Sequence, residues 1–235
     1  MNYNSVNKVR ITAFRATENP EACDKFIEGH SKVLSSHGVD KVTSSNNDWK
    51  YNPEAYVILI ETGDGERVLG GSRVHCLGGT QPLPLVPATR DLDKSVIDYV
   101  DQLGEKGVGE ICGLWNSLEV AGMGVGSIFS IRCAVAILSQ LNIQYSLALC
   151  SPYTARLAGN YGFNIEESLG NNGTFYYPKL DLLATIVRLD DVHTIPGGNE
   201  HEMKRIFNLR ENPVQTKEEK GRKGAEFIIE YNLKI

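Results

Sequence analysis

The sequence predicts a mixed α/β fold in one domain, and three local patterns lead to this prediction. Apolar residues at helical spacing follow Asn19-Pro20, two apolar segments flank a Gly-Asp-Gly turn at 63–65, and a glycine-rich loop at 119–127 separates an apolar strand from an amphipathic helix. A further apolar segment follows that helix, so the loop lies at the first turn of a β-α-β unit. The 235 residues are sufficient for one well-filled hydrophobic core.

The N-terminal half is expected to contain one long helix, a β-hairpin and one short helix. Asn19 and Pro20 suit the cap and first turn of the long helix, and residues 63–65 are a hairpin turn signal. Prolines are expected to prevent regular structure after the hairpin. The expected elements are a helix over about 20–36, strands over 55–60 and 67–77, a loop without regular structure over 78–90, and a short helix closed by Gly104.

The C-terminal half continues the alternation of strands and helices. Ser151 and Pro152 suit the cap and first turn of a short helix that ends near Gly162, and a turn at 171–173 separates two strands. No repeat or linker divides the chain, so residues 1–235 are interpreted as a single domain. Its core covers about 10–190, followed by a C-terminal extension over 190–235. The other expected elements are a strand over 110–118, a helix over 127–142, a strand over 144–150, a helix near 199–209 and a terminal apolar segment from Phe227 to Tyr231.

Composition and charge argue against several classes of protein. The formal net charge is −5, and no dense stripe of Lys and Arg occurs outside the mixed segment 217–223, which disfavours nucleic acid or an anionic membrane as the main partner. No apolar run approaches the roughly 20 residues of a membrane span, and the N-terminus has no signal-peptide pattern, so a cytoplasmic protein is expected. The five cysteines are scattered through apolar segments, which predicts reduced core thiols and no metal site.

The glycine-rich loop is a candidate phosphate site. Glycines at every second position from Gly122 to Gly126 allow a tight turn, so that backbone N–H groups and the positive end of the next helix can point at an anion. A P-loop requires a lysine directly before Ser127, which is absent. A dinucleotide fingerprint requires a different glycine spacing and an acidic residue at the end of the next strand, where Cys150 stands. An NAD-dependent oxidoreductase is therefore disfavoured.

Two ordered motifs resemble the GNAT acyltransferase superfamily. Residues 120–127 are similar to its acyl-CoA pyrophosphate loop, Arg/Gln-x-x-Gly-x-Gly/Ala, and residues 151–163 are similar to its segment Asn-x-x-Ala-x-x-Leu-Tyr-x-x-x-Gly-Phe. Segments 56–76 and 109–112 look like the acyl-homoserine-lactone synthase and N-acyl amino acid synthase branch of that superfamily. The resemblance implies a central mixed, mostly antiparallel twisted sheet whose central strands splay apart, flanked by helices.

The resemblance also implies an N-acyltransferase in which the amine of a small molecule or amino acid directly attacks the thioester of acyl-CoA, or of an acyl carrier protein. The alternative is a non-catalytic acyl-CoA-binding sensor or scaffold. It is suggested by Ala121 at the Arg/Gln position of the loop and by Ala158 at the position of the tyrosine that protonates the leaving thiolate. Donor binding is expected to be weakened rather than lost, because backbone amides supply most of the phosphate contacts. The residues expected at the donor are Val120, Gly122, Met123, Gly124, Val125, Gly126, Ser127, Ser151 and Arg156.

The acceptor end of such a site requires a carboxylate that takes a proton from the amine. The candidates are Glu110, which opens a strand, and Glu119, beside the glycine loop. The competing interpretation of Glu110 is a salt bridge at the sheet edge, and that of Glu119 is a solvated turn residue. Tyr153, Tyr161 or Ser151 is expected to replace the missing tyrosine, and the sequence does not choose among them.

Two further residues are candidate substrate contacts. The synthase branch has a functional arginine at the position of Arg73, which either holds an acceptor carboxylate or pairs across strands. Trp115 is interpreted as a core residue, with the lining of an acyl channel as the second option. His30, His37 and His75 have no consistent spacing for a triad or a metal and are interpreted as structural.

Overall fold

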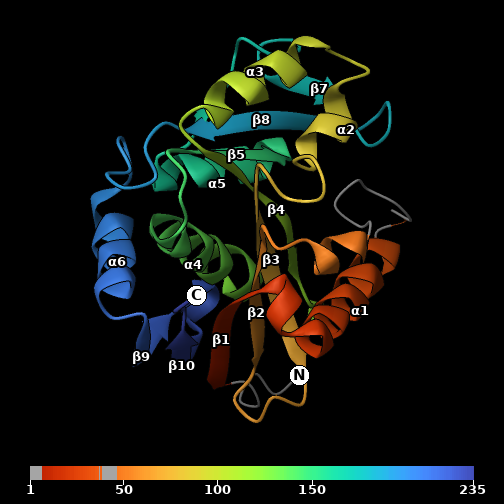
Figure 1. Cartoon of the computed structure of the whole chain (residues 1–235). Coiled ribbons are helices and arrows are strands. Elements are labelled where there is room, and N and C mark those ends of the chain that lie inside the picture. Colours follow the sequence, from red (N-terminus) through yellow and green to blue (C-terminus); the bar gives the residue numbers. More distant parts are fainter. Residues whose placement is uncertain (1–6, 37, 39–46) are drawn as a thin grey trace.

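The computed structural model describes residues 7–36, 38 and 47–235, and one sheet runs through this part of the chain (Figure 1). The strands are β1 (Lys8–Arg15), β2 (Ala55–Thr62), β3 (Val68–Cys76), β4 (Val108–Asn116), β5 (Tyr145–Cys150), β6 (Asn164–Ile165), β7 (Thr174–Tyr176), β8 (Leu183–Leu189), β9 (Val214–Lys220) and β10 (Glu226–Asn232). Their order is β6-β8-β5-β4-β3-β2-β1-β10-β9, and β7 also pairs with β8. Within the described residues only the β1–β10 and β4–β5 pairs are parallel, which confirms the expected mixed, mostly antiparallel sheet.

Helices cover both faces of this sheet. They are α1 (Pro20–Ser36), α2 (Leu85–Thr89), α3 (Ser95–Gly104), α4 (Ser130–Ile137), α5 (Pro152–Ala158) and α6 (Glu200–Glu211). Alternate residues of β2 belong to different cores: Val57 packs in the cluster that contains α1, whereas Ile58 packs in the cluster that contains α4. Both faces of β2 are therefore buried, which agrees with its uninterrupted apolar sequence.

Most of the expected elements are confirmed. The Asn19 side chain caps α1 by accepting a hydrogen bond from Ala22 N at 3.1 Å, and the Ser151 hydroxyl caps α5 by accepting one from Thr154 N at 3.2 Å. The β2–β3 hairpin, α3, the β4-α4-β5 unit and α6 also occur where the sequence predicts them. His37, one of the histidines interpreted as structural, lies outside the described residues.

Some expectations are wrong in detail. The proline-rich stretch contains α2, because Pro87 lies in the first turn of this helix, where a backbone N–H has no partner within the helix. β4 begins and ends two residues before the predicted strand over 110–118, because the chain turns into the loop at Ser117. The predicted helix over 127–142 is divided into a π-helical turn (Val125–Phe129), α4 and a 3-10 turn (Leu138–Gln140). Three strands rather than two follow α5, since β6 and β7 each pair with β8.

A C-terminal hairpin completes the sheet. The terminal apolar segment forms β10, which pairs in parallel with β1, and β9 pairs with β10 at the sheet edge. Neither β1 nor β9 is among the strands expected from the sequence. The final residues of the described chain therefore share a sheet with its first residues.

The cysteines agree with the expectation of core thiols. All five are free and four of them are buried. Burial raises the pKa of Cys133 and of Cys150 to about 12, so neither thiol ionises near neutral pH. No helix in the described part of the chain is long and apolar enough to cross a bilayer.

A buried arginine ties α4 to the C-terminal elements. Arg132 of α4 is inaccessible to solvent; its Nε donates to Glu202 of α6 at 2.9 Å, and its Nη1 donates to Glu219 of β9 at 3.2 Å. Removing these charges from water costs several kcal/mol per ion, a cost that the close pairing offsets. The cost of burying each of these charges is consequently offset by its pairing with the others.

We expect Arg132→Met to lower the free energy of unfolding by about 3–5 kcal/mol, because it leaves Glu202 and Glu219 without their buried partner. Urea denaturation followed by circular dichroism measures this difference. Lys204→Gln is the matched control, since Lys204 pairs with Glu200 on the exposed side of α6 and its loss should cost less than about 0.5 kcal/mol. Equal effects of the two substitutions would contradict a special role for the buried network.

Candidate active site

Strands β4 and β5 separate near the centre of the sheet. They pair only where Val108–Glu110 meets Tyr145–Leu147, although β4 stays paired with β3 and β5 with β8 beyond that point. The two strands thus form a wedge, by which we mean the opening between residues 111–116 of β4 and 148–150 of β5. The splayed central strands expected from the sequence are confirmed.

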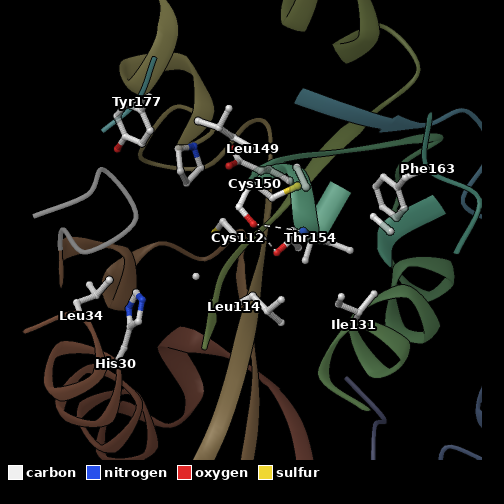
Figure 2. A pocket seen from close by; sticks show the side chains of 17 residues that line it. His30, Leu34, Cys112, Leu114, Ile131, Leu149, Cys150, Thr154, Phe163 and Tyr177 are labelled. Carbon is white, nitrogen blue, oxygen red and sulfur yellow. Dashed lines mark hydrogen bonds between the residues drawn. The ribbon is translucent and has the colours of Figure 1, made fainter. Parts of the chain in front are cut away.

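A cavity of about 260 Å³ occupies the wedge and reaches both faces of the sheet (Figure 2). At one end His30 and Leu34 enter from α1, and at the opposite end Ile131 and Phe163 close the space from the α4 side. His30 therefore lies at one end of the cavity, and apolar side chains close the other. The remaining lining residues are Pro84, Glu110, Ile111, Cys112, Gly113, Leu114, Ala148, Leu149, Cys150, Ser151, Thr154, Ala158 and Tyr177.

A β-bulge shapes the β4 side of the wedge. Gly71 pairs with Trp115 and Arg73 pairs with Cys112, so two residues of β4 oppose one residue of β3 between these pairs. Gly113, within the bulge, has φ of +56°, and a Cβ there would lie 2.9 Å from Arg73 Nε. The position thus requires glycine for both its conformation and its contact.

The structure places Arg73 directly behind the cavity wall. Its side chain is fully buried, and its guanidinium carbon lies 4.3 Å from the centre of the Trp49 ring and 5.6 Å from that of Phe26. Gly113, whose backbone lines the cavity, separates Arg73 from the space. Arg73 therefore supports the wall and places a positive charge near His30 and Glu110.

Glu110 lines the cavity at the point where β4 and β5 separate. Its Oε2 accepts a hydrogen bond from Leu85 N of α2 at 2.7 Å, and its side chain is almost fully buried. Burial raises the pKa of Glu110 to about 8, more than the Leu85 hydrogen bond and the charge of Arg73 lower it. A carboxyl group that titrates near neutral pH suits proton transfer.

His30 is a cavity residue whose position the sequence analysis did not anticipate. Its ring stacks on Trp115 with centroids 6.3 Å apart, and it lines the cavity that Glu110 also lines. Burial and the charge of Arg73 lower the pKa of His30 to about 4, so the imidazole is neutral at physiological pH. Its spacing of four residues from Phe26 is the sequence signal that places it on the inner face of α1.

Three other predicted residues lie outside this cavity. Glu119 is exposed and forms an ion pair with Arg67. Tyr153 is 60% exposed, and its hydroxyl accepts a hydrogen bond from Arg222 Nη1 at 2.7 Å. Trp115 packs among Phe26 and other core residues and borders a separate hollow on the α1 side. The structure therefore places Glu110 and His30 on one cavity, and Glu119 and Tyr153 outside it.

The glycine loop lies at the open end of the wedge, directly after β4. Gly122 and Gly124 have φ of +78° and +90°, values that favour glycine. Gly126 approaches the end of β4 so closely that its N–H donates to Asn116 Oδ1 at 2.9 Å. The π-helical turn that follows leads directly into α4, so the positive end of this helical segment points toward the loop.

Residues 151–161, in and around α5, include side chains that line the cavity and side chains that are exposed to solvent. Ser151, at the start of α5, lines the cavity, and its Oγ lies 3.1 Å from Thr154 Oγ1. Arg156 is exposed on the same helix. Ala158 faces the cavity without a hydroxyl, and the buried Tyr161 donates its hydroxyl to Ile128 O at 3.2 Å. In the part of the chain that the structure describes, no group of three His, Cys, Asp or Glu residues is placed to hold a metal ion.

Known structures share this fold. The N-acyl amino acid synthase FeeM from uncultured soil microbes superposes with a TM-score of 0.57 at 15% identity, over 84% of this chain and 99% of that one. The CoA-dependent acyl-homoserine lactone synthase BjaI, solved with SAM and isopentyl-CoA, gives 0.54 at 12% identity, over 85% and 90%. An acyl-CoA N-acyltransferase from Pseudomonas aeruginosa gives 0.52 at 11% identity, over 77% and 99%.

At these identities the similarity concerns the fold. No protein-family model and no curated protein sequence matches the chain. The chain therefore has the architecture of GNAT acyltransferases, including that of the synthase branch, as its sequence motifs predict.

We expect Gly113→Ala to lower the free energy of unfolding by about 1–3 kcal/mol, because a methyl group would meet Arg73 and the backbone is left-handed. Gly159→Ala is the control: Gly159 has helical φ, and no atom lies within 4 Å of an added Cβ, so the change should be neutral or stabilise by up to about 1 kcal/mol. Chemical denaturation of both variants measures the difference. Equal free energies of unfolding for the two variants would contradict the close contact between Gly113 and Arg73.

Glu110 should make stability depend on pH in a definite direction. Its pKa is about 8 in the folded protein and about 4.3 in the unfolded chain, so the folded state binds the extra proton between these values. The contribution of Glu110 to stability is therefore present below about pH 4.3 and is lost as the pH rises through about 8. We expect the melting temperature of Glu110→Gln, relative to that of the wild type, to increase as the pH rises from about 5 to about 8.5. If the melting temperatures of the two proteins changed equally with pH across this range, a buried, neutral Glu110 would be contradicted.

Proposed function

We propose that the protein is an N-acyltransferase that transfers an acyl group from a CoA thioester, or from an acyl carrier protein, to the amine of a small molecule or amino acid. One observation carries this proposal: a cavity crosses the sheet through the wedge and connects the side of α4 and α5 with Glu110 and His30. An arrangement of this kind lets a thioester and an amine approach each other from opposite faces.

The donor is assigned to the α4 and α5 side of the sheet. Its phosphates are placed at the glycine loop, and its pantetheine arm extends along β4 toward the apolar end formed by Ile131, Ala158 and Phe163. The cavity of about 260 Å³ is smaller than the roughly 300–1,000 Å³ of most small-molecule sites, which favours a short acyl group.

The chemistry requires no covalent enzyme intermediate. The amine attacks the thioester carbonyl, whose oxygen is polarised by backbone N–H groups at the edge of the wedge. Glu110, in its ionised form, accepts the proton that the amine loses, and neutral His30 orients the amine by accepting a hydrogen bond from it. The carbon–sulfur bond then breaks and the CoA thiolate leaves, with the hydroxyls of Ser151 and Thr154 on the same wall available to donate to it.

The alternative is a non-catalytic binder of acyl-CoA. One observation favours it, because Ala158 presents no hydroxyl to the cavity at the position where the superfamily has its proton-donating tyrosine. A thiolate is a tolerable leaving group near neutral pH, so the absence of this tyrosine lowers the rate without preventing the reaction. Turnover distinguishes the two functions, since both predict donor binding.

We expect acetyl-CoA to raise the melting temperature and, with pooled amino acids, to release free thiol; octanoyl- and palmitoyl-CoA test the preference for short chains. Glu110→Gln should lower kcat by about 10²- to 10⁴-fold while keeping the thermal shift with acyl-CoA. Glu105→Gln, the same change at an exposed position before β4, is the control and should keep full activity. Thermal stabilisation without thiol release would support the binder, and no response to these thioesters or to an acyl carrier protein loaded with the same chains would refute both functions.

A further inference from the structure

The tip of the C-terminal hairpin rests on the glycine loop. Arg222 N donates to Met123 O at 2.8 Å, and a Cβ on Gly221 would lie 2.4 Å from the same oxygen. Lys223 Nζ lies 2.7 Å from the position that a Cβ on Gly122 would occupy. Two segments about 100 residues apart in sequence are thus in direct contact, and the space above Gly122 is filled by an ammonium group.

This tip brings positive charge to a loop that has none of its own. Residues 119–127 contain no Lys or Arg, and Ala121 stands where the superfamily has Arg or Gln. Arg222 and Lys223 are both exposed, and no carboxylate of the described residues lies within 4.0 Å of either. Two cations without an acidic partner therefore border the glycine loop, which is a chemistry suited to a phosphate group.

Several contacts hold the hairpin tip that carries these cations. The Arg222 guanidinium donates to Tyr153 OH of α5 at 2.7 Å. Phe227, just after the tip, packs edge-on against Phe129 with ring centroids 5.8 Å apart. The hairpin itself is held in the sheet by its pairing with β1. The cations are consequently presented by an ordered element.

We propose that Lys223 and Arg222 bind the phosphates of the donor, so that the C-terminal hairpin supplies the charge that the glycine loop lacks. This inference rests on the proposed function, because the ligand is its donor. The shared chemistry is a phosphate ester of pantetheine, which occurs both in CoA and on an acyl carrier protein. Two cations match the pyrophosphate of CoA better than the single phosphodiester of a carrier protein. Tyr153 then acts as a positioning residue for Arg222.

Isothermal titration calorimetry with CoA, 4′-phosphopantetheine and unphosphorylated pantetheine tests this inference. We expect Lys223→Gln and Arg222→Gln each to raise the Kd of CoA about tenfold, with a smaller effect on phosphopantetheine and none on pantetheine. The dependence of CoA affinity on salt should also become shallower in both variants. Lys220→Gln, a change on the same hairpin at a lysine paired with Glu226, is the control and should bind CoA as the wild type does.

The outcomes separate this inference from the proposed function. Unchanged CoA affinity in both tip variants, or an equal loss in the Lys220 control, overturns the inference even if the enzyme turns over. Loss of CoA affinity in the tip variants together with absence of any turnover supports the inference and refutes catalysis. Equal effects on CoA and on phosphopantetheine assign the cations to the phosphate next to pantetheine, and so permit a carrier-protein donor. Absence of CoA and phosphopantetheine binding by the wild type overturns the inference. Melting temperatures of the free variants verify that folding is intact.

Discussion

The contact between Arg73 and the bulge at Gly113 is the constraint on which the site depends. Bulges bend a strand and increase its twist, so the extra residue in β4 turns this strand away from β5 while its pairing with β3 continues. The buried guanidinium, held between aromatic rings, fills the space beneath the bulge. The same cation lowers the pKa of His30 and opposes the rise in the pKa of Glu110. One side chain thus influences both the shape and the electrostatics of the cavity.

A second buried arginine performs a different task in α4. Arg132 joins α4, which follows the glycine loop, to α6 and β9 through Glu202 and Glu219. Removing one partner of a buried ion pair is costly, so these contacts hold α4, α6 and β9 to one another. Because β9 leads directly into the tip with Arg222 and Lys223, this network also determines where those cations lie.

The features predicted well from the sequence are those with local causes. Caps at Asn19 and Ser151, the turn at 63–65 and the glycine loop each depend on a few adjacent residues, and all of them occur in the structure. The features that were missed depend on distant contacts. β9 is polar because it lies at an edge and buries little beyond Glu219, so its sequence lacks a strand pattern. The α2 helix was missed because Pro87 was interpreted as a helix breaker without regard to its position in the first turn.

The residues of the candidate site likewise divide into those predicted from local sequence and those that depend on distant contacts. Glu110 and the loop residues follow from motifs, whereas His30 acquires its role only when α1 packs against Trp115. Lys223 could not be connected with Gly122 by any local pattern, because the contact is made through the pairing of β10 with β1. The preference for Glu110 over Glu119 as the base also required the structure, since burial rather than sequence position separates their environments.

The opposite pKa shifts of Glu110 and His30 have a common consequence for an incoming amine. Between about pH 4 and about pH 8 the carboxyl is protonated and the imidazole is neutral, so the empty acceptor end buries no net charge from this pair. The α-ammonium group of a peptide terminus has a pKa of about 7.7–8.0, close to that of Glu110, so for an acceptor of this acidity moving a proton between them is nearly balanced in free energy. The acceptor can therefore enter as an ammonium ion opposite an ionised Glu110, or as a free amine beside the protonated carboxyl. Both states have the same total number of protons. The reactive state of the proposed mechanism, a free amine beside an ionised Glu110, has one proton fewer, so its population rises with pH.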